Sequence, residues 1–231
     1  MKQKIVVLTG AGMSADSGIK TFRDAGGLWE GHDVMEVASP QGFRANPTLV
    51  LDFYNQRRRQ LKEVQPNEGH TSLVQLETHY DVSIITQNVD DLHERAGSQN
   101  VLHLHGELLK VRSTIDEHDI YEWHEDLLLG DTSHKGHQLR PHIVWFGEEV
   151  PLLEEAASIT SKADIIIIIG TSLQVYPAAG LMHYAAPKTP IYFVDPKPTI
   201  SISPEWDLHI IPKSAAIGVP ILVLDLLHRA L

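Results

Sequence analysis

A short apolar run that leads directly into a glycine-rich turn is the feature that most constrains this fold. Residues 5–8 are aliphatic, and the turn and helix start that follow contain Gly10, Ala11, Gly12, Ser14 and Ala15. A strand, a Gly-x-Gly-x-x-Ala turn and a helix start bind pyrophosphate in dinucleotide-binding folds, because glycine allows close backbone approach and the helix start offers free N–H groups. Such turns also occur for packing alone, so the rest of the chain must decide.

Four short apolar runs have the composition of strands that are buried on both faces. They cover residues 5–8, 82–85, 165–169 and 191–194. Helical patterns alternate with them at 47–61, 69–79, 152–161 and 220–231, the last opening on a proline that suits a first helical position. This alternation predicts an α/β fold of the Rossmann type, with a doubly wound parallel sheet.

Two stretches break the alternation. Residues 24–44 are long, contain glycine and lack periodicity, so we expect a functional loop there. Residues 112–140 are polar and lie between extended segments at 101–111 and 141–146. We therefore expect a single domain over 1–231 with a small inserted lobe at 112–140.

Composition limits the classes of function. The formal net charge is −11, which argues against nonspecific nucleic-acid binding. The longest purely aliphatic run, 165–169, is far too short to span a bilayer, and the first strand follows the N-terminus without a leader pattern. We expect a cytoplasmic protein that uses neither membrane nor nucleic acid. The absence of cysteine excludes disulfides and a thiolate zinc site.

Small and polar residues follow the other predicted strands. These are Thr86 to Asp91 after the second strand, Gly170, Thr171 and Ser172 after the third, and Asp195 after the fourth. Ligands of open α/β sheets bind at the carboxyl ends of the strands, where an acid can accept hydrogen bonds from ribose hydroxyls. Each group alone could be a turn or a helix cap. Together they predict one dinucleotide site.

Two histidines alternate with leucines just before Gly106. The alternation predicts that His103 and His105 share one face of an extended segment. A histidine at a strand end can face a cleft and act as a general base near neutral pH. A purely structural histidine is the alternative.

Six motifs resemble, in order, those of the sirtuins, the NAD-dependent protein-lysine deacylases, and are most similar to the short bacterial desuccinylase-like class. They are Gly10-Ala11-Gly12-Met13-Ser14, Thr21-Phe22-Arg23, Thr86-Gln87-Asn88-Val89-Asp90, His103-Leu104-His105-Gly106, Val144-Trp145-Phe146-Gly147-Glu148 and Gly170-Thr171-Ser172. The resemblance covers nearly the whole chain. It implies NAD as the cofactor and an acyl-lysine protein or peptide as the substrate.

The resemblance also implies a role for each matching residue. His105 matches the catalytic base, Asn88 and Asp90 match the nicotinamide pocket, and Gln87 matches the residue that holds the adjoining ribose. The other implied cofactor contacts are Gly10, Ala11, Gly12, Ser14, Ala15, Thr21, Phe22, Arg23, Trp29, Val89, Gly170, Thr171, Ser172, Asp195 and Ala215. Asp195 stands where the family commonly has asparagine.

The implied substrate contacts fall in two groups. Val144, Phe146, Gly147 and Glu148 match the segment whose backbone pairs with an extended peptide. Tyr54 and Arg57 lie three apart on a predicted helix, where a hydroxyl and a guanidinium can hold a carboxylate. This spacing, with Ala25, matches the class that accepts succinyl and malonyl groups, so we expect these acyl groups alongside acetyl. A solvated basic turn at 57–59 is the alternative.

The chain departs from the family at its zinc site. Most sirtuins carry four zinc-binding cysteines, and Ser113 stands where the first would fall. His118, His124, His134 and His137 are irregularly spaced, so we expect solvated side chains and no metal. The lobe is then expected to rely on packing, through Ile120, Tyr121, Trp123 and residues 127–129.

The predicted activity is deacylation of protein lysine, with release of nicotinamide and O-acyl-ADP-ribose. Two alternatives remain open at this point. One is a mono-ADP-ribosyltransferase that uses the same nicotinamide-cleaving pocket. The other is a noncatalytic sensor of NAD or ADP-ribose.

Overall fold

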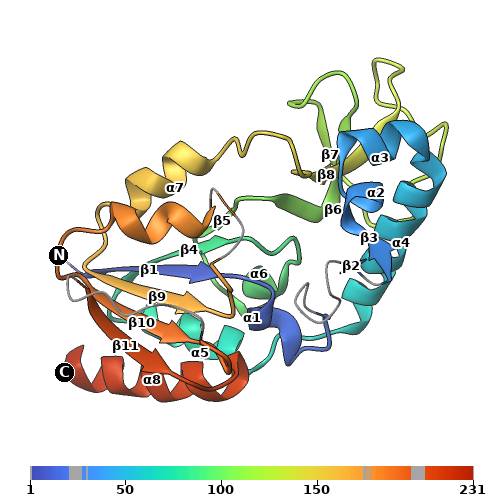
Figure 1. Cartoon of the computed structure of the whole chain (residues 1–231). Helices are drawn as coiled ribbons and strands as arrows, with labels where there is room; N and C mark the ends of the chain where they lie inside the picture. Colours follow the sequence, from blue (N-terminus) through green and yellow to red (C-terminus); the bar gives the residue numbers. More distant parts are fainter. Residues whose placement is uncertain are drawn as a thin grey trace.

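A six-stranded parallel sheet forms the centre of the protein in the computed structural model, which describes residues 2–20, 28–29, 31–173, 176, 178–198 and 206–230 (Figure 1). Its strands are β1 (Lys4–Thr9), β4 (Asp81–Thr86), β5 (Val101–His103), β9 (Ile165–Ile169), β10 (Pro190–Val194) and β11 (Asp207–Ile211). The order across the sheet is β11-β10-β9-β1-β4-β5. The predicted Rossmann-type α/β fold is therefore confirmed.

The strand order reverses in the middle of the sheet. From β1 the chain moves outward through β4 to β5, returns to β9 on the other side of β1, and moves outward again through β10 to β11. Thr9 and Ile169, the last residues of β1 and β9, are register partners. The glycine loops after these two strands thus meet at the topological switch point, where open α/β sheets bind their ligands.

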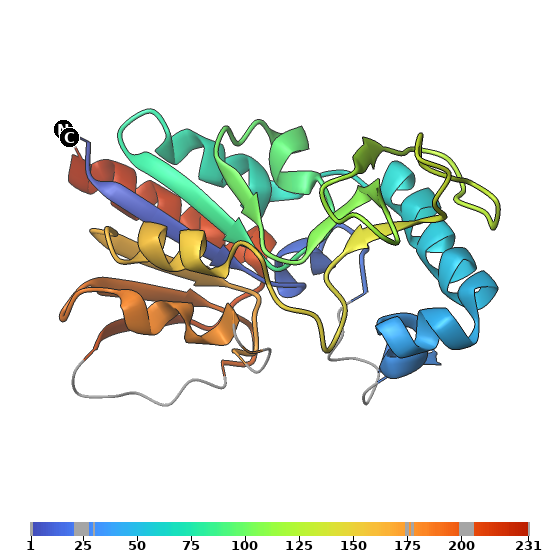
Figure 2. The same ribbon diagram turned by 90° about the horizontal axis from the view of Figure 1, so that it is seen from above.

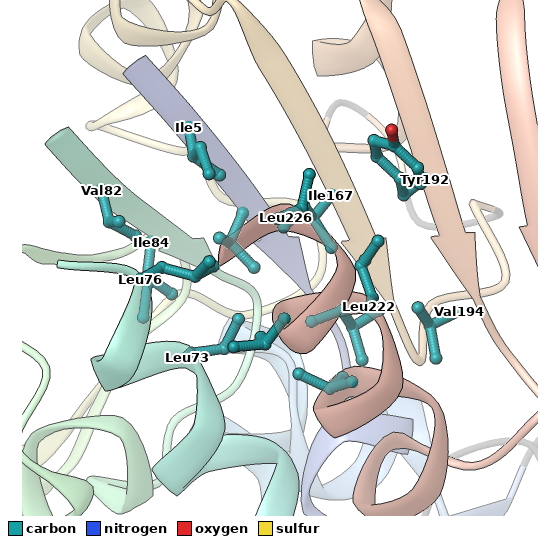
Figure 3. Close-up of a cluster of buried hydrophobic side chains, with 14 of the residues drawn as sticks. Ile5, Leu73, Leu76, Val82, Ile84, Ile167, Tyr192, Val194, Leu222 and Leu226 are labelled. Carbon is teal, nitrogen blue, oxygen red and sulfur yellow. The ribbon is translucent and has the colours of Figure 1, made fainter. Parts of the chain in front are cut away.

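Alternating side chains of the strands divide the core between the two faces of the sheet. Ile5 and Val7 of β1 belong to one buried cluster, whereas Val6 and Leu8 belong to the other. Helices α5 (Glu68–Leu76) and α8 (Ala215–Ala230) cover the first face, and Figure 3 shows their leucines packed on the strands. The other face is covered by α7 (Leu153–Thr160) and the 3₁₀ helix η2 (Ala178–Tyr184).

A second body, which we call the small module, lies beyond the carboxyl ends of the strands (Figure 2). Its three-stranded antiparallel sheet has the order β7-β6-β8. The strands are β6 (Gly106–Ser113), β7 (Ile120–Glu122) and β8 (Leu139–Ile143), and the helices beside them are α2 (Val34–Val37), α3 (Pro40–Ala45) and α4 (Pro47–Glu63). The segment 112–140 is therefore one part of a larger body that also includes helices from the first quarter of the chain.

The second half of segment 24–44 is not irregular, which corrects the expected loop. A hairpin of β2 (Leu28–Trp29) and β3 (His32–Asp33) leads into α2 and α3. The side chain of Asp33 accepts from the backbone of α2, and Ser39 caps α3 with Pro40 in its first turn. Helices of four and six residues are too short to show a helical periodicity in the sequence.

Three further expectations need correction. Helix α8 begins at Ala215, so Pro220 lies inside it and does not open it. Strands β5 and β11 lie at the two edges of the sheet. Their sequences are not fully buried apolar runs, so the pattern did not predict them as strands of this sheet. In the small module, Tyr121 and Trp123 pack on buried Leu127, but Ile120, Leu128 and Leu129 are exposed. No helix among the described residues is both long enough and apolar enough to cross a bilayer.

Candidate functional site

A cavity of about 740 Å³ lies between the carboxyl ends of the strands and the small module. Its sheet side is lined by residues that follow β1, β4, β5, β9 and β10, including Gly10, Ala11, Gly12, Ser14, Ala15, Gln87, Asn88, Val89, Asp90, His105, Gly170, Thr171, Ser172 and Asp195. The opposite side is lined by Trp29, Tyr54, Val144, Trp145, Phe146, Gly147 and Glu148. The structure thus brings most of the candidate residues to one place, and the volume is typical of small-molecule sites.

The glycine loops after β1 and β9 touch each other backbone to backbone. Gly12 N–H donates to the Gly170 carbonyl at 2.8 Å, and a Cβ on Gly12 would lie 2.6 Å from the Gly170 Cα. Gly170 itself has a φ of +60°. The glycines therefore allow the two loops to approach each other at the cavity floor. The predicted helix start is only the single turn α1 (Gly12–Ala15), so it offers backbone N–H groups and little helix dipole.

Ser14, Asn88 and Asp90 form a buried polar cluster on the cavity wall. The Ser14 hydroxyl donates to Asp90 Oδ2 at 2.9 Å and accepts from Asn88 Nδ2 at 3.2 Å. Burial raises the pKa of Asp90 to about 6, although the hydrogen bonds from Ser14 and the Leu92 backbone oppose the shift. An amide and a carboxyl group side by side can bind a ligand amide, which needs both a donor and an acceptor.

His105 lies at the boundary between the sheet and the small module, in the turn between β5 and β6. Its Nδ1 is 3.1 Å from the Gln87 carbonyl oxygen, which can only accept, so Nδ1 carries the proton. In the neutral ring, Nε2 is then the nitrogen that can accept a proton. Burial lowers the pKa of His105, although the bond to Gln87 opposes this. A neutral imidazole in a ligand cavity fits a general base.

His103 does not share the cavity with His105, contrary to the expected common face. β5 ends at His103 and the chain turns before Gly106, whose φ is +82°. His103 is buried among protein groups, with Nε2 2.7 Å from Glu94 Oε1 and Nδ1 3.0 Å from the Asn88 carbonyl oxygen. It is the structural histidine of the pair.

Tyr54 and Arg57 occupy different environments on α4. Tyr54 is fully buried and lines the cavity, and its hydroxyl accepts a hydrogen bond from Trp145 Nε1 at 2.9 Å. The Arg57 guanidinium lies over the Phe53 ring, 4.2 Å from its centroid, and is not part of the described lining. The alternative of a solvated basic turn is wrong for Arg58, which is buried and donates to Asn55 and to the Leu108 carbonyl.

Glu148 joins the cavity wall to a buried ion-pair network. Its carboxylate contacts Arg140 at 2.6 Å and Arg112 at 3.3 Å, and it accepts from the Trp145 backbone N–H at 2.8 Å. Arg140 also stacks on the Trp145 ring at 3.4 Å. The side chain of Glu148 therefore has a structural role. Its neighbours Phe146 and Gly147 are exposed and lie at the rim of the cavity.

The remaining candidates differ in position. Asp195 lies at the end of β10, lines the cavity and accepts from the Lys197 N–H at 2.8 Å. Ala215 is buried in the core at the start of α8 and is not among the lining residues, whereas its neighbour Ser214 is. Thr21, Phe22, Arg23 and Ala25 lie outside the described residues.

Sequence reasoning missed several lining residues, namely Asp16, Ile19, Ala38, Ile143, Val150, Tyr176, Pro196, Lys197 and Ser214. Pro196 and Lys197 come shortly after the end of β10, and that position was the available signal. Asp16 also accepts from the Ala216 N–H at 3.0 Å, so it ties the first loop to the start of α8.

Ser113, at the position of the first absent cysteine, has a local role. Its hydroxyl accepts from the backbone N–H groups of Ile115 and Asp116 at 3.2 and 3.4 Å. His118, His124 and His134 are exposed and His137 is half-buried. In the part of the chain that the structure describes, no group of three or more histidine, cysteine or acidic side chains is placed to hold a metal ion.

Comparison with known families fits this geometry. The model of the Sir2 family matches residues 10–177, which is more than half of the chain. The chain belongs to the Sir2 family. This Sir2-family chain is 66% identical over 195 residues to an NAD-dependent protein deacylase of Helicobacter pylori (strain J99), covering 84% of this chain and 83% of the relative. It is 52% identical over 223 residues to an NAD-dependent protein deacylase of Bacteroides thetaiotaomicron, covering 94% and 95%.

Solved structures of Sir2 proteins share the fold over nearly the whole chain. A Sir2 homologue in complex with NAD superposes with a TM-score of 0.86 at 37% identity, covering 100% of this chain and 91% of the homologue. A Sir2 protein bound to acetylated peptide gives a TM-score of 0.76 at 28% identity, covering 99% and 93%.

Proposed function

We propose that this chain is an NAD-dependent protein deacylase that takes the acyl group from an acylated lysine and releases nicotinamide and O-acyl-ADP-ribose. The observation that carries the proposal is the position of His105, which lines the same cavity as Asn88 and Asp90 and is held there through Nδ1. The names of the relatives from Helicobacter and Bacteroides support the same activity.

The lining of the cavity fits NAD. The touching glycine loops leave the backbone at the switch point accessible, and Asp195 ends a strand where a ribose-binding acid is found in dinucleotide sites. Asn88 and Asp90 offer a donor and an acceptor to a carboxamide. When bound, NAD supplies an electrophilic ribose carbon whose bond to nicotinamide can break.

The chain's own residues then have separable tasks. Asn88 and Asp90 orient the nicotinamide carboxamide, and Gln87 reaches toward the adjoining ribose from the same turn. His105 accepts a proton at Nε2 from a sugar hydroxyl, because its Nδ1 proton is committed to the Gln87 carbonyl. The apolar wall formed by Trp29, Tyr54 and Trp145 excludes water from the reacting groups.

The rim at Phe146 and Gly147 supports a peptide-binding role. These residues are exposed at the cavity mouth, where an extended acyl peptide can pair with their backbone and send its lysine inward. Tyr54 supports selection of succinyl and malonyl groups, since it lines the cavity and its hydroxyl can donate a hydrogen bond. Arg57, three residues on, is the second half of the proposed carboxylate site.

A panel of acyl-lysine peptides tests the activity. Acetyl, malonyl and succinyl versions of one peptide are incubated with the protein and NAD, and products are identified by mass spectrometry. We expect nicotinamide release only when acyl peptide is present, with O-acyl-ADP-ribose as the co-product. ADP-ribose attached to protein would instead indicate a transferase, and ligand binding without turnover would indicate a sensor.

A further inference from the structure

Two consecutive backbone carbonyls in the loop after β4 are each held by the Nδ1 atom of a histidine. His105 Nδ1 lies 3.1 Å from the Gln87 carbonyl oxygen, and His103 Nδ1 lies 3.0 Å from the Asn88 carbonyl oxygen. The two histidines are two residues apart in the chain, but only His105 lines the cavity. His103 therefore supports the same loop from behind.

The partners of His103 fix its protonation state. Its Nε2 lies 2.7 Å from Glu94 Oε1, and both the carboxylate and the Asn88 carbonyl only accept hydrogen bonds. Both ring nitrogens must carry a proton for both bonds to form, so the ring is an imidazolium. Burial disfavours that charge, but the hydrogen bond and charge of Glu94 outweigh it, and the pKa of His103 is raised.

The backbone N–H of Asn88, on the other side of its Cα, is also held. It donates to Thr86 Oγ1 at 3.0 Å, and this hydroxyl is bonded to Thr9 Oγ1 at 2.8 Å. His93 Nε2 is 3.2 Å from Thr9 Oγ1. His93 and Glu94 are neighbours on α6 (Leu92–Ala96), so one short helix supports both sides of Asn88.

We propose that the Glu94–His103 pair is a positioning device that holds Asn88 in the geometry needed to bind the nicotinamide group. The inference rests on the proposed function, because it assigns the Asn88 side chain to the nicotinamide part of the cavity. Without the charge of Glu94 the ring is neutral, so the bond from His103 Nδ1 to the Asn88 carbonyl loses its charge assistance and weakens. The Asn88 loop then gains freedom while Gly10, Gly170 and Asp195 are untouched.

The other charged groups near His103 determine which variant is a suitable control. Glu94 faces it from α6, Glu107 from β6 and Asp90 from the loop that carries Asn88. His93 is kept neutral by burial, while Lys110 pairs with Glu107 at 2.7 Å. Glu107 raises the pKa of His103 through its charge while its carboxylate pairs with Lys110, so Glu107→Gln is the matched control for Glu94→Gln.

Binding measurements separate this role from a structural one. Titration calorimetry measures ADP-ribose binding to the wild-type protein and to Glu94→Gln, His103→Gln and Glu107→Gln, and then nicotinamide binding to each ADP-ribose-loaded protein. We expect Glu94→Gln and His103→Gln to weaken nicotinamide binding by about tenfold, the scale of one hydrogen bond to a charged group. ADP-ribose binding should stay within about twofold, because ADP-ribose lacks the group that Asn88 binds.

The pH profile gives a second readout. In the wild-type protein, nicotinamide affinity should hold at pH 6.5, the ordinary histidine value, and fall as the pH rises past the raised pKa of His103. In Glu94→Gln the same fall should occur at lower pH, since the partner that most raises this pKa has lost its charge. Glu107→Gln should shift the fall less than Glu94→Gln does, because Glu107 raises the pKa of His103 less than Glu94 does.

Two outcomes overturn the inference. One is nicotinamide binding by Glu94→Gln that matches Glu107→Gln. The other is an equal loss of ADP-ribose affinity, which indicates general damage to the fold. The Glu94 side chain is 41% exposed, so its variant remains informative if His103→Gln fails to fold. A wild-type protein that binds nicotinamide and ADP-ribose but never turns over acyl peptide would contradict the proposed function and leave this inference standing.

Discussion

Trp145 Nε1 donates a hydrogen bond to the Tyr54 hydroxyl at 2.9 Å, and this bond joins helix α4 to the segment that follows β8. Burial raises the pKa of Tyr54 far above its ordinary value, so the hydroxyl keeps its proton at every physiological pH. The hydroxyl accepts from Trp145 and still has its own proton to donate, and Tyr54 lines the cavity. A carboxylate at the end of an acyl chain is a suitable acceptor.

This arrangement predicts that acyl selectivity depends on Arg57 and Tyr54. Arg57→Met should depress kcat/KM for a succinyl-lysine peptide by at least about tenfold, the scale of a lost charge-assisted bond. The acetyl-lysine peptide should change little, because it lacks a carboxylate. Equal losses on the two peptides would refute carboxylate recognition.

Tyr54→Phe carries a separate prediction for stability. The substitution leaves Trp145 Nε1 buried without its acceptor, which costs about 1–3 kcal/mol. We expect a lower urea midpoint for Tyr54→Phe than for Arg57→Met, which loses a partly exposed contact with the Phe53 ring. A wild-type midpoint in Tyr54→Phe would show that Trp145 finds another acceptor.

The lowered pKa of His105 predicts the acid limb of the rate profile. The neutral ring is the active base, and burial keeps it neutral below the ordinary histidine value of 6.5. We expect kcat to hold steady as the pH falls to 6.5 and to decline only below it. His105→Ala should reduce kcat by at least about 100-fold while NAD still binds. Activity that is retained in this variant would remove His105 as the base.

The raised pKa of Asp90 predicts that its buried charge lowers the stability of the fold at neutral pH, although we propose that the residue serves ligand binding. Because its folded pKa of about 6 exceeds the ordinary 3.8, the native state binds the proton more tightly, and stability declines as pH rises between these values. Asp90→Asn removes the buried charge, so we expect it to raise the free energy of unfolding at pH 8 by about 1 kcal/mol. It should also weaken nicotinamide binding. Denaturant curves at pH 4 and pH 8 check the first expectation, since the gain should disappear at pH 4.

Glu148 gives the opposite pH dependence. Burial raises its pKa, but the hydrogen bond and charge of Arg140 outweigh this and hold the pKa below the ordinary 4.5. Its contribution to stability is therefore present above pH 4.5 and is lost as the pH falls further. Glu148→Gln should cost about 3 kcal/mol at pH 7, because it leaves two arginines in a mostly buried site without their counter-charge. The difference from wild type should shrink in acid, and a constant difference would contradict the ion-pair account.

The four inner strands of the central sheet could be predicted because they are buried on both faces. The run 165–169 consists only of isoleucine, and each of these four strands ends where a glycine or polar residue follows. β11 alternates exposed and half-buried residues at the sheet edge, so it lacks that signature. Pro220 suggests a helix start, but α8 begins at Ala215, and the Ala216 N–H donates to Asp16, which lies 200 residues earlier.

The candidate site was predictable where chemistry follows a strand end and unpredictable where it depends on distant contacts. Gln87, Asn88 and Gly170 are found from local sequence, because the sheet fixes where strand ends meet. The separate environments of His103 and His105 depend on the turn before Gly106. The alternation of histidine with leucine in the sequence does not predict this turn. Pairing of Tyr54 with Trp145 joins residues 91 positions apart and needs the folded small module.

The ion pair of Glu148 with Arg140 helps to hold the small module together. The chain contains no cysteine. Oxidants that convert thiols to sulfenic acids or disulfides therefore find no target anywhere in this sequence. Protonation of the Glu148 carboxylate is expected to weaken its contact with Arg140. A reductant or a thiol-blocking reagent should leave the module assembled, whereas acidification should weaken it.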